Sequence, residues 1–162
     1  MLLKFIFMRI TGLLSLVFLL LLCGSLRAQP TPVKLRMLTG YTVDPKTMLE
    51  NGLNFWVLTS QKKFDKLFGI AKGEPPLPCA PDFSKEMVVV MALPPTQSEI
   101  VMKYNSAMRA GSYIEVYCSV KKTIPLTYTM YPLVVAAIPR IPGVNTINYY
   151  EDHKLIGTAK AL

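Results

Sequence analysis

The residues that could do chemistry in this sequence are few and far apart. Cys79 lies between Pro78 and Pro81, Cys118 lies in an alternating apolar stretch, and His153 is the single histidine. A cysteine nucleophile needs a neighbouring base or a helix start to lower its pKa, and the proline-bracketed turn around Cys79 offers neither. The sequence also contains no nucleotide-binding motif. We therefore expect no catalytic residue.

A metal site would have to be assembled from scattered ligands. The candidates are Asp82, Glu86 and His153, with the polar run 151–154 as a second cluster. Neither set has the ligand spacing typical of zinc sites. Asp82 is explained more simply as a turn residue, because an aspartate side chain accepts hydrogen bonds from main-chain amides two or three residues later. The sequence predicts no metal and no other cofactor.

The first 28 residues have the three parts of a secretory signal peptide. Two basic residues precede an apolar run over residues 13–22, and small and polar residues follow up to Ala28. Cleavage after Ala28 would release a secreted or periplasmic protein. Two alternatives are an uncleaved membrane anchor, because the apolar stretch approaches the ~20 residues that span a bilayer, and a lipid on Cys23. A lipidated cysteine normally follows a small residue, and here it follows a leucine.

Removal of residues 1–28 from the 162 leaves 134, which fits one domain with a core of its own. The leader contains three of the 18 basic residues and none of the 10 acidic ones, so the mature net charge is +5. The lysines form scattered pairs, and no nucleic-acid-binding signature accompanies them. We expect no nucleic-acid partner, while the mild positive charge favours an anionic partner or an anionic envelope surface.

Export would leave an even pair of cysteines, Cys79 and Cys118, in an oxidising compartment. The alternation of apolar residues over 113–120 points Cys118 into the core. A bridge between the two would close a loop of roughly 40 residues and contribute about 3–4 kcal/mol on the chain-entropy model. We expect a disulfide between Cys79 and Cys118.

The mature chain is predicted to be β-rich. Residues 29–50 contain three prolines and form an extended arm with an edge strand, and residues 51–162 form a single β-rich domain. The valine-rich run 87–93 is short for a helix and is stopped by a proline, which indicates a strand buried on both faces. Ser60 is expected to cap a short helix, because Phe64, Leu67 and Phe68 follow at helical spacing, with Gly69 as its end signal.

The second half of the chain alternates between apolar and polar residues. Residues 98–121 are expected to form a hairpin about Gly111. Pro132 excludes an unbroken central strand, so its segment is expected to be an edge strand, a bulged strand, or an irregular entry followed by a strand over Leu133–Ile138. Two closing strands meet at a turn over residues 151–153. The predicted fold is mainly β: an antiparallel β-sandwich or partly open barrel with one short helix.

Three segments resemble a known family of secreted bacterial proteins. "FWVLTSQKKFDKLFG", "PDFSKEMVVVMAL" and "TYTMYPLVVAAIPR" are similar in layout to the protease complex subunit PrcB C-terminal domain family over residues 55–140. Where members often carry a glycine-rich stretch after the central strand, this chain has "PPTQSE". The resemblance implies an exported, non-catalytic module that binds or stabilises a protein partner, such as a protease. It implies no catalytic residue.

Four tyrosines are the candidate partner-binding residues: Tyr113, Tyr117, Tyr149 and Tyr150. Exposed tyrosines supply rigid contact area at protein interfaces, although the same rings could simply pack against the helix or one another. Two hypotheses follow. The preferred one is an exported β-sandwich that binds a protease or another envelope protein. The alternative is a small envelope hydrolase whose site the sequence does not reveal.

Overall fold

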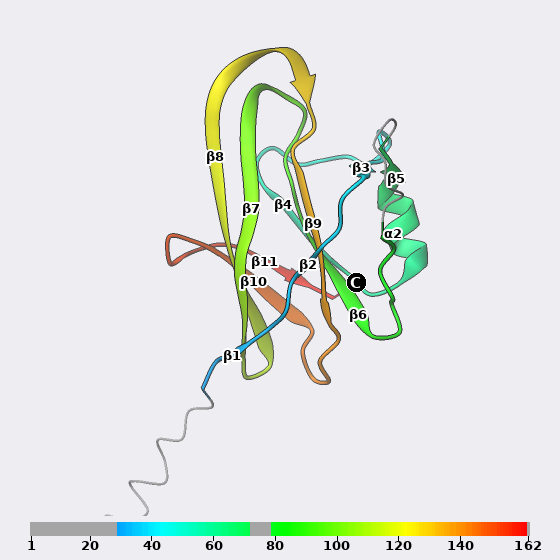
Figure 1. The fold of residues 1–162 in the computed structure, drawn as a ribbon, viewed down its shortest axis with the longest axis vertical. Coiled ribbons are helices and arrows are strands. Elements are labelled where there is room, and N and C mark those ends of the chain that lie inside the picture. Colours follow the sequence, from blue (N-terminus) through cyan, green and yellow to red (C-terminus); the bar gives the residue numbers. More distant parts are fainter. Residues whose placement is uncertain (1–28, 72–78, 162) are drawn as a thin grey trace, which may run out of the picture.

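The computed structural model of the chain describes residues 29–71 and 79–161 (Figure 1). The expected signal peptide, together with Cys23, lies outside the described residues. Among the residues that are described, no helix is both long and apolar enough to cross a bilayer.

The described chain is mainly β, with one short helix, α2 (Gln61–Leu67). Five strands form one sheet in the order β1-β7-β8-β10-β11, and four form a second sheet in the order β2-β9-β6-β4, while β3 pairs with β5. None of these sheets closes into a barrel. The strands are β1 (Thr31–Pro32), β2 (Arg36–Met37), β3 (Tyr41–Val43), β4 (Asn54–Leu58), β5 (Phe68–Ile70), β6 (Glu86–Ala92), β7 (Thr96–Ala110), β8 (Tyr113–Met130), β9 (Leu133–Pro139), β10 (Thr146–Glu151) and β11 (Lys154–Lys160).

The two larger sheets pack face to face and the helix covers the outer side of the four-stranded one. Strand β6 belongs to both hydrophobic clusters that result. Its Met87, Val89 and Met91 face the five-stranded sheet, and Val88 and Val90 face the helix layer. Figure 1 shows this order of layers, with β7 and β8 on one side of β6 and α2 on the other. The prediction of a strand buried on both faces is confirmed.

The helix is confirmed, but its ends differ from the prediction. Ser60 occupies the N-cap position without making a side-chain capping bond, and the helix ends at Leu67, before Gly69. Phe68 is already extended, because it pairs with Val43 in the small β3–β5 sheet. Phe64, the buried residue of the helix, packs edge-on against the Tyr41 ring at 4.9 Å.

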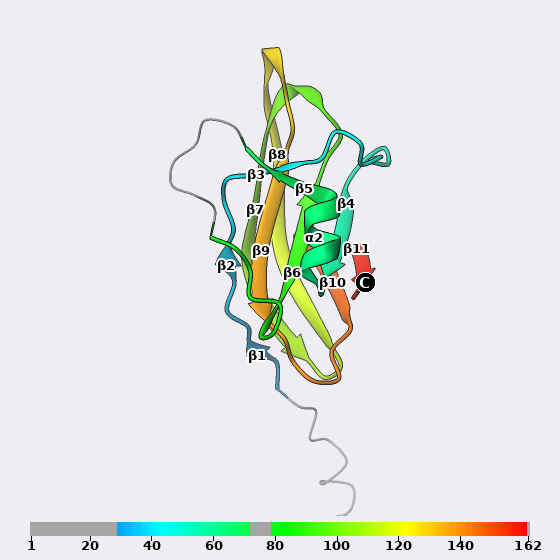
Figure 2. The same ribbon diagram turned by 90° about the vertical axis from the view of Figure 1, so that its right-hand side faces the viewer.

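The N-terminal arm is extended, as expected, and it joins the edges of all three sheets. Thr31 pairs with Arg109 at the edge of the five-stranded sheet, and Arg36 pairs with Ala137 at the edge of the four-stranded sheet. Strand β3 then completes the small sheet. Figure 2 shows the arm running along the side of the sandwich from β1 through β2 to β3.

The expected hairpin about Gly111 is present and is longer than predicted, since β7 and β8 have 15 and 18 residues. The two strands extend beyond the rest of the sandwich (Figure 1). Strand β9 begins at Leu133, directly after Pro132, in agreement with one of the three alternatives for this segment. The closing turn is also confirmed, with Asp152 and His153 at φ 45° and 64°, the left-handed values that a two-residue hairpin turn requires.

One pairing departs from the antiparallel pattern: β10 is parallel to β8. Strand β9, which lies between them in sequence, belongs to the other sheet, so the chain returns to the five-stranded sheet running in the direction of β8. A sequence pattern of alternating strands does not contain this information, because alternation is the same for either direction.

Candidate functional site

The outer face of the five-stranded sheet carries three of the four tyrosines that the sequence singles out. In β8 the residues Ile114, Val116 and Cys118 are buried in the sandwich core, so Tyr113, Glu115 and Tyr117 point to the opposite side. Tyr150 on β10 is the cross-strand neighbour of Tyr117, and Leu155 on β11 is the neighbour of Tyr150. We call this set of five residues, Tyr113, Glu115, Tyr117, Tyr150 and Leu155, the tyrosine face.

Two contacts hold rings of the tyrosine face in place. The Tyr117 hydroxyl donates a hydrogen bond of 2.7 Å to Glu115 Oε2. The rings of Tyr117 and Tyr150 stack at 5.6 Å between centroids, with 27° between their planes. All three tyrosines are half-buried and Leu155 is 50% exposed, so the face offers apolar area that still meets solvent.

The electrostatics of the tyrosine face favour the neutral form of two of its phenols, Tyr117 and Tyr150. The hydrogen bond to the Glu115 carboxylate, followed by partial burial, raises the pKa of Tyr117 to about 12. Burial, followed by the charges of Glu115 and Tyr113, raises the pKa of Tyr150. A protonated phenol remains a hydrogen-bond donor, so the face presents neutral rings around a single carboxylate.

Tyr149 is not part of this surface, which corrects one of the four predicted partner-binding residues. Its side chain is fully buried, and its hydroxyl donates to the Trp56 carbonyl oxygen at 3.3 Å. Its ring packs on Phe55 at 4.4 Å, and burial raises its pKa well above the ordinary value. Successive side chains of a strand point to opposite faces, so Tyr149 and Tyr150 cannot both face outward.

The predicted disulfide is absent from the structure, in which Cys79 and Cys118 are both free. Cys118 lies between the two large sheets, where its thiol donates to the Tyr150 carbonyl at 3.4 Å. Cys79 is exposed and accepts a hydrogen bond of 3.1 Å from Arg36, whose partner residue Ala137 belongs to the cluster on the helix side. The four-stranded sheet therefore separates the two thiols. Burial, followed by the Glu151 carboxylate, raises the pKa of Cys118 to about 11.

The acidic turn before β6 performs the structural role that its sequence indicates. Asp82 Oδ1 accepts bonds from the main-chain N–H and the hydroxyl of Ser84, at 3.0 and 2.6 Å. Glu86 forms a salt bridge with Arg36 at 2.6 Å, which ties the arm to β6 and, chiefly through that hydrogen bond, lowers the pKa of Glu86. His153 lies in the β10–β11 turn, which Figure 1 places on the far side of the molecule from this loop. No set of three or more described His, Cys, Asp or Glu side chains is grouped to hold a metal ion.

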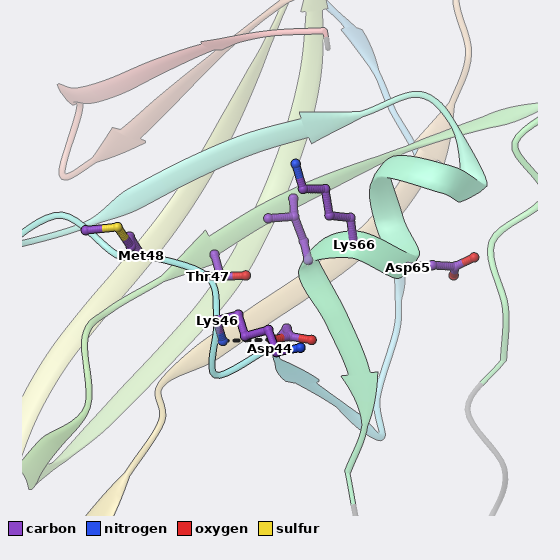
Figure 3. A pocket seen from close by; sticks show the side chains of 7 residues that line it. Asp44, Lys46, Thr47, Met48, Asp65 and Lys66 are labelled. Carbon is purple, nitrogen blue, oxygen red and sulfur yellow. Dashed lines mark hydrogen bonds between the residues drawn. The ribbon is translucent and has the colours of Figure 1, made fainter.

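An open hollow of about 490 Å³ lies between the loop after β3 and the end of α2. Its charged residues are Asp44, Lys46, Asp65 and Lys66. Figure 3 shows the Asp65 carboxylate pointing away from Asp44, and the Lys66 chain pointing in a different direction. Asp44 Oδ1 accepts the main-chain N–H of Lys46 at 2.7 Å, a turn bond. These groups do not converge on one point, as a reacting acid and base would.

The sequence did not single out Glu115 or Leu155, although both belong to the tyrosine face. Glu115 could have been found from its spacing, because it lies two residues from Tyr113 and from Tyr117 and must share their side of a strand. Leu155 could not, because its place beside Tyr150 depends on a register shift between β10 and β11 at Tyr149/Tyr150.

No family model, curated protein or solved structure matches this chain. The resemblance to the PrcB C-terminal domain family therefore stays a prediction from three short sequence segments.

Proposed function

We propose that this chain is an exported, non-catalytic module that binds a protein partner through the tyrosine face. The observation that supports the proposal is the preorganised pair of Tyr117 and Tyr150, stacked on each other, with the Tyr117 hydroxyl fixed on Glu115. Rings that are already ordered lose little conformational freedom on binding, which is why tyrosine is favoured at protein interfaces.

The composition of the tyrosine face indicates what kind of surface it would meet. Three phenol rings and an exposed leucine surround one carboxylate, so the face is mainly apolar with a single negative group. A complementary partner would bring an apolar or aromatic patch and one hydrogen-bond donor or cation for Glu115. The partner class that the sequence resemblance implies is a protease or another envelope protein.

The experiment compares a double variant, Tyr117→Ala with Tyr150→Ala, with a matched control, Tyr128→Ala. Tyr128 is 63% exposed and lies on β8 outside the tyrosine face. Each protein is immobilised and used to capture partners from an envelope extract, and its melting temperature is measured. We expect the wild type and the Tyr128→Ala control to capture a protein that the double variant does not capture. The melting temperature of the double variant should be nearly unchanged.

Two results would overturn the proposal. One is equal capture by the double variant and the wild type. The other is turnover of ester, peptide or glycoside substrates by the purified protein, which would support the alternative of a small hydrolase.

A further inference from the structure

One edge of strand β7 is paired over only a short part of its length by the strands that the structure describes. On one side β8 pairs with β7 from Thr96 to Ala110. On the other side β1 pairs only with Met108 and Arg109, and Val33 adds one bond to the Ala107 carbonyl. From Thr96 to Ser106, no strand among the described residues covers this second edge. An open edge of this kind is a template for another strand.

Side chains on this part of the strand reach solvent, since Val101 is 47% exposed and Lys103 is also exposed. Figures 1 and 2 show β7 and β8 rising together above β3 and β5, beyond the packed part of the sandwich. Register shifts interrupt the pairing of β7 with β8 before Ile100 and after Tyr104. Between these two residues the pairing is unbroken. This stretch is therefore a regularly pleated strand, the geometry that a further strand needs in order to pair.

The residues along the edge are arranged symmetrically about Val101, whose side chain is 47% exposed. Glu99 lies two residues before it and Lys103 two residues after it, so opposite charges occupy equivalent positions. Two further symmetric pairs carry matching residue types, the apolar pair Ile100 and Met102 and the amide pair Gln97 and Asn105, whereas Ser98 and Tyr104 differ. If two copies of this strand pair antiparallel about Val101, each Glu99 lies opposite the Lys103 of the other copy.

The charges along this edge also differ from those of an edge that is protected against pairing with a second copy. Proteins commonly protect an open edge with unpaired lysines, which repel a second copy. Here Glu99 and Lys103 are the charged residues between Thr96 and Ser106, and they cancel. Glu99 accepts a hydrogen bond from the Thr123 hydroxyl of β8, on the paired side of β7, so its carboxylate must exchange this bond for Lys103 when a second copy binds.

We propose that two copies of this chain associate through their β7 edges as an antiparallel, two-fold symmetric pair centred on Val101. The two five-stranded sheets then become one continuous sheet across the dimer. Each pair of edges contributes two Glu99–Lys103 contacts, because the two-fold axis generates both. This inference does not depend on the tyrosine face, which lies on other residues.

The first test reverses each charge in a separate variant and then mixes the two variants. The full chain is expressed with its leader, and the purified protein is studied by light scattering across a wide range of concentration. Glu99→Lys and Lys103→Glu should each weaken the dimer by about tenfold or more, since each places two like-charged pairs across the two-fold axis. An equimolar mixture of the two variants should restore dimers, because the mixed pair has opposite charges at both positions. Lys62→Glu on the exposed face of α2 makes the same charge change away from the edge, and should leave the dimer unchanged.

A cross-linking test checks the register and does not depend on how much the charges contribute. In a Cys79→Ser background, Val101→Cys should form a disulfide-linked dimer on mild oxidation, because directly opposed residues have Cα atoms about 4.5–5.5 Å apart. Gln97→Cys on the same strand should not, because the two copies of position 97 would be about 27 Å apart at ~3.4 Å per residue.

The proposal is overturned by a wild-type protein that stays monomeric at every concentration, by single variants that dimerise as the wild type does, or by a mixture that stays monomeric. Equal cross-linking at positions 97 and 101 would also overturn it.

Discussion

Gly157 gives the sharpest test of how the two sheets fit together. It lies in β11 opposite Tyr149, and the ring of Phe55 from the other sheet lies directly against it. A Cβ atom added at Gly157 would be 2.3 and 2.5 Å from two carbon atoms of that ring. Carbon atoms in contact prefer about 3.5–4.0 Å, so the ring would have to move by more than ~1 Å. The ring is also packed against Tyr149, at 4.4 Å between ring centroids.

We expect Gly157→Ala to lower the free energy of unfolding by about 1–3 kcal/mol, the usual cost of overpacking a core. The loss of unfolded-chain entropy in a glycine-to-alanine change offsets part of this, by about 0.4–1 kcal/mol. The measurement is urea unfolding followed by circular dichroism, analysed as a two-state transition. The control is Gly69→Ala, because a Cβ there would have its nearest neighbour at 4.0 Å. It should show only the entropic gain, a rise in stability of at most about 0.4–1 kcal/mol.

A double variant separates overpacking from other effects. Phe55→Leu removes the ring that the added methyl group of Gly157→Ala would contact. The loss of stability caused by Phe55→Leu should therefore be smaller in the Gly157→Ala background than in the wild type. Strictly additive effects, or a Gly157→Ala protein as stable as Gly69→Ala, would refute the reasoning that Phe55 occupies the space above Gly157.

Three further predictions follow from contacts in and around the five-stranded sheet. Tyr149→Phe removes the bond to a main-chain carbonyl on β4 and should lower the free energy of unfolding by about 1 kcal/mol in thermal or urea unfolding. A thiol reagent should label Cys79 in the native protein and reach Cys118 only after unfolding, because Cys118 is buried and its pKa is raised to about 11. The raised pKa of Tyr117, about 12 against an ordinary 10.0, means that its contribution to stability is present below pH 10.0 and lost as the pH rises towards about 12. An ultraviolet titration should show the Tyr117 step near pH 12, and Glu115→Gln should shift it downward.

Each of these predictions has a clear counter-result. Tyr150→Phe is the control for Tyr149→Phe and should change stability by less than ~0.5 kcal/mol; equal losses would mean that the bond to Trp56 contributes nothing. Equal labelling rates for the two cysteines in the native state would contradict the burial of Cys118. A Tyr117 titration that does not respond to Glu115→Gln would show that the carboxylate is not the cause of the raised pKa.

Much of the fold could be predicted because local signals agree with the final structure. The valine run of β6, the helical spacing of Phe64 and Leu67, and the turn at Asp152 each define an element by its own residues. The length of β8 could not be predicted. Pro125 normally breaks a strand, and here it is accommodated opposite Ser98, where the pairing of the two strands shifts register.

Part of the candidate site could also be predicted, because the local alternation of residues agrees with the final structure. Alternation places Tyr113 and Tyr117 on one side of β8, but the side on which Tyr150 lies depends on how β10 pairs with β8. The disulfide prediction failed because alternation gives only the direction of Cys118. Alternation does not show on which side of the four-stranded sheet Cys79 lies, because tertiary packing decides this. The hydrogen bond from Arg36 places Cys79 on the helix side.

The arm that links all three sheets has a consequence for the order of folding. Thr31 and Arg36 come early in the chain, yet their partners Arg109 and Ala137 are made much later. Contacts between residues so far apart in sequence carry a large loop-closure cost and form slowly. The hairpin of β7 and β8 has no such cost, so we expect it to form early and the arm to dock last. The same arm should be the first segment to detach when the native protein opens, and its amide hydrogens should exchange with solvent long before those of β6.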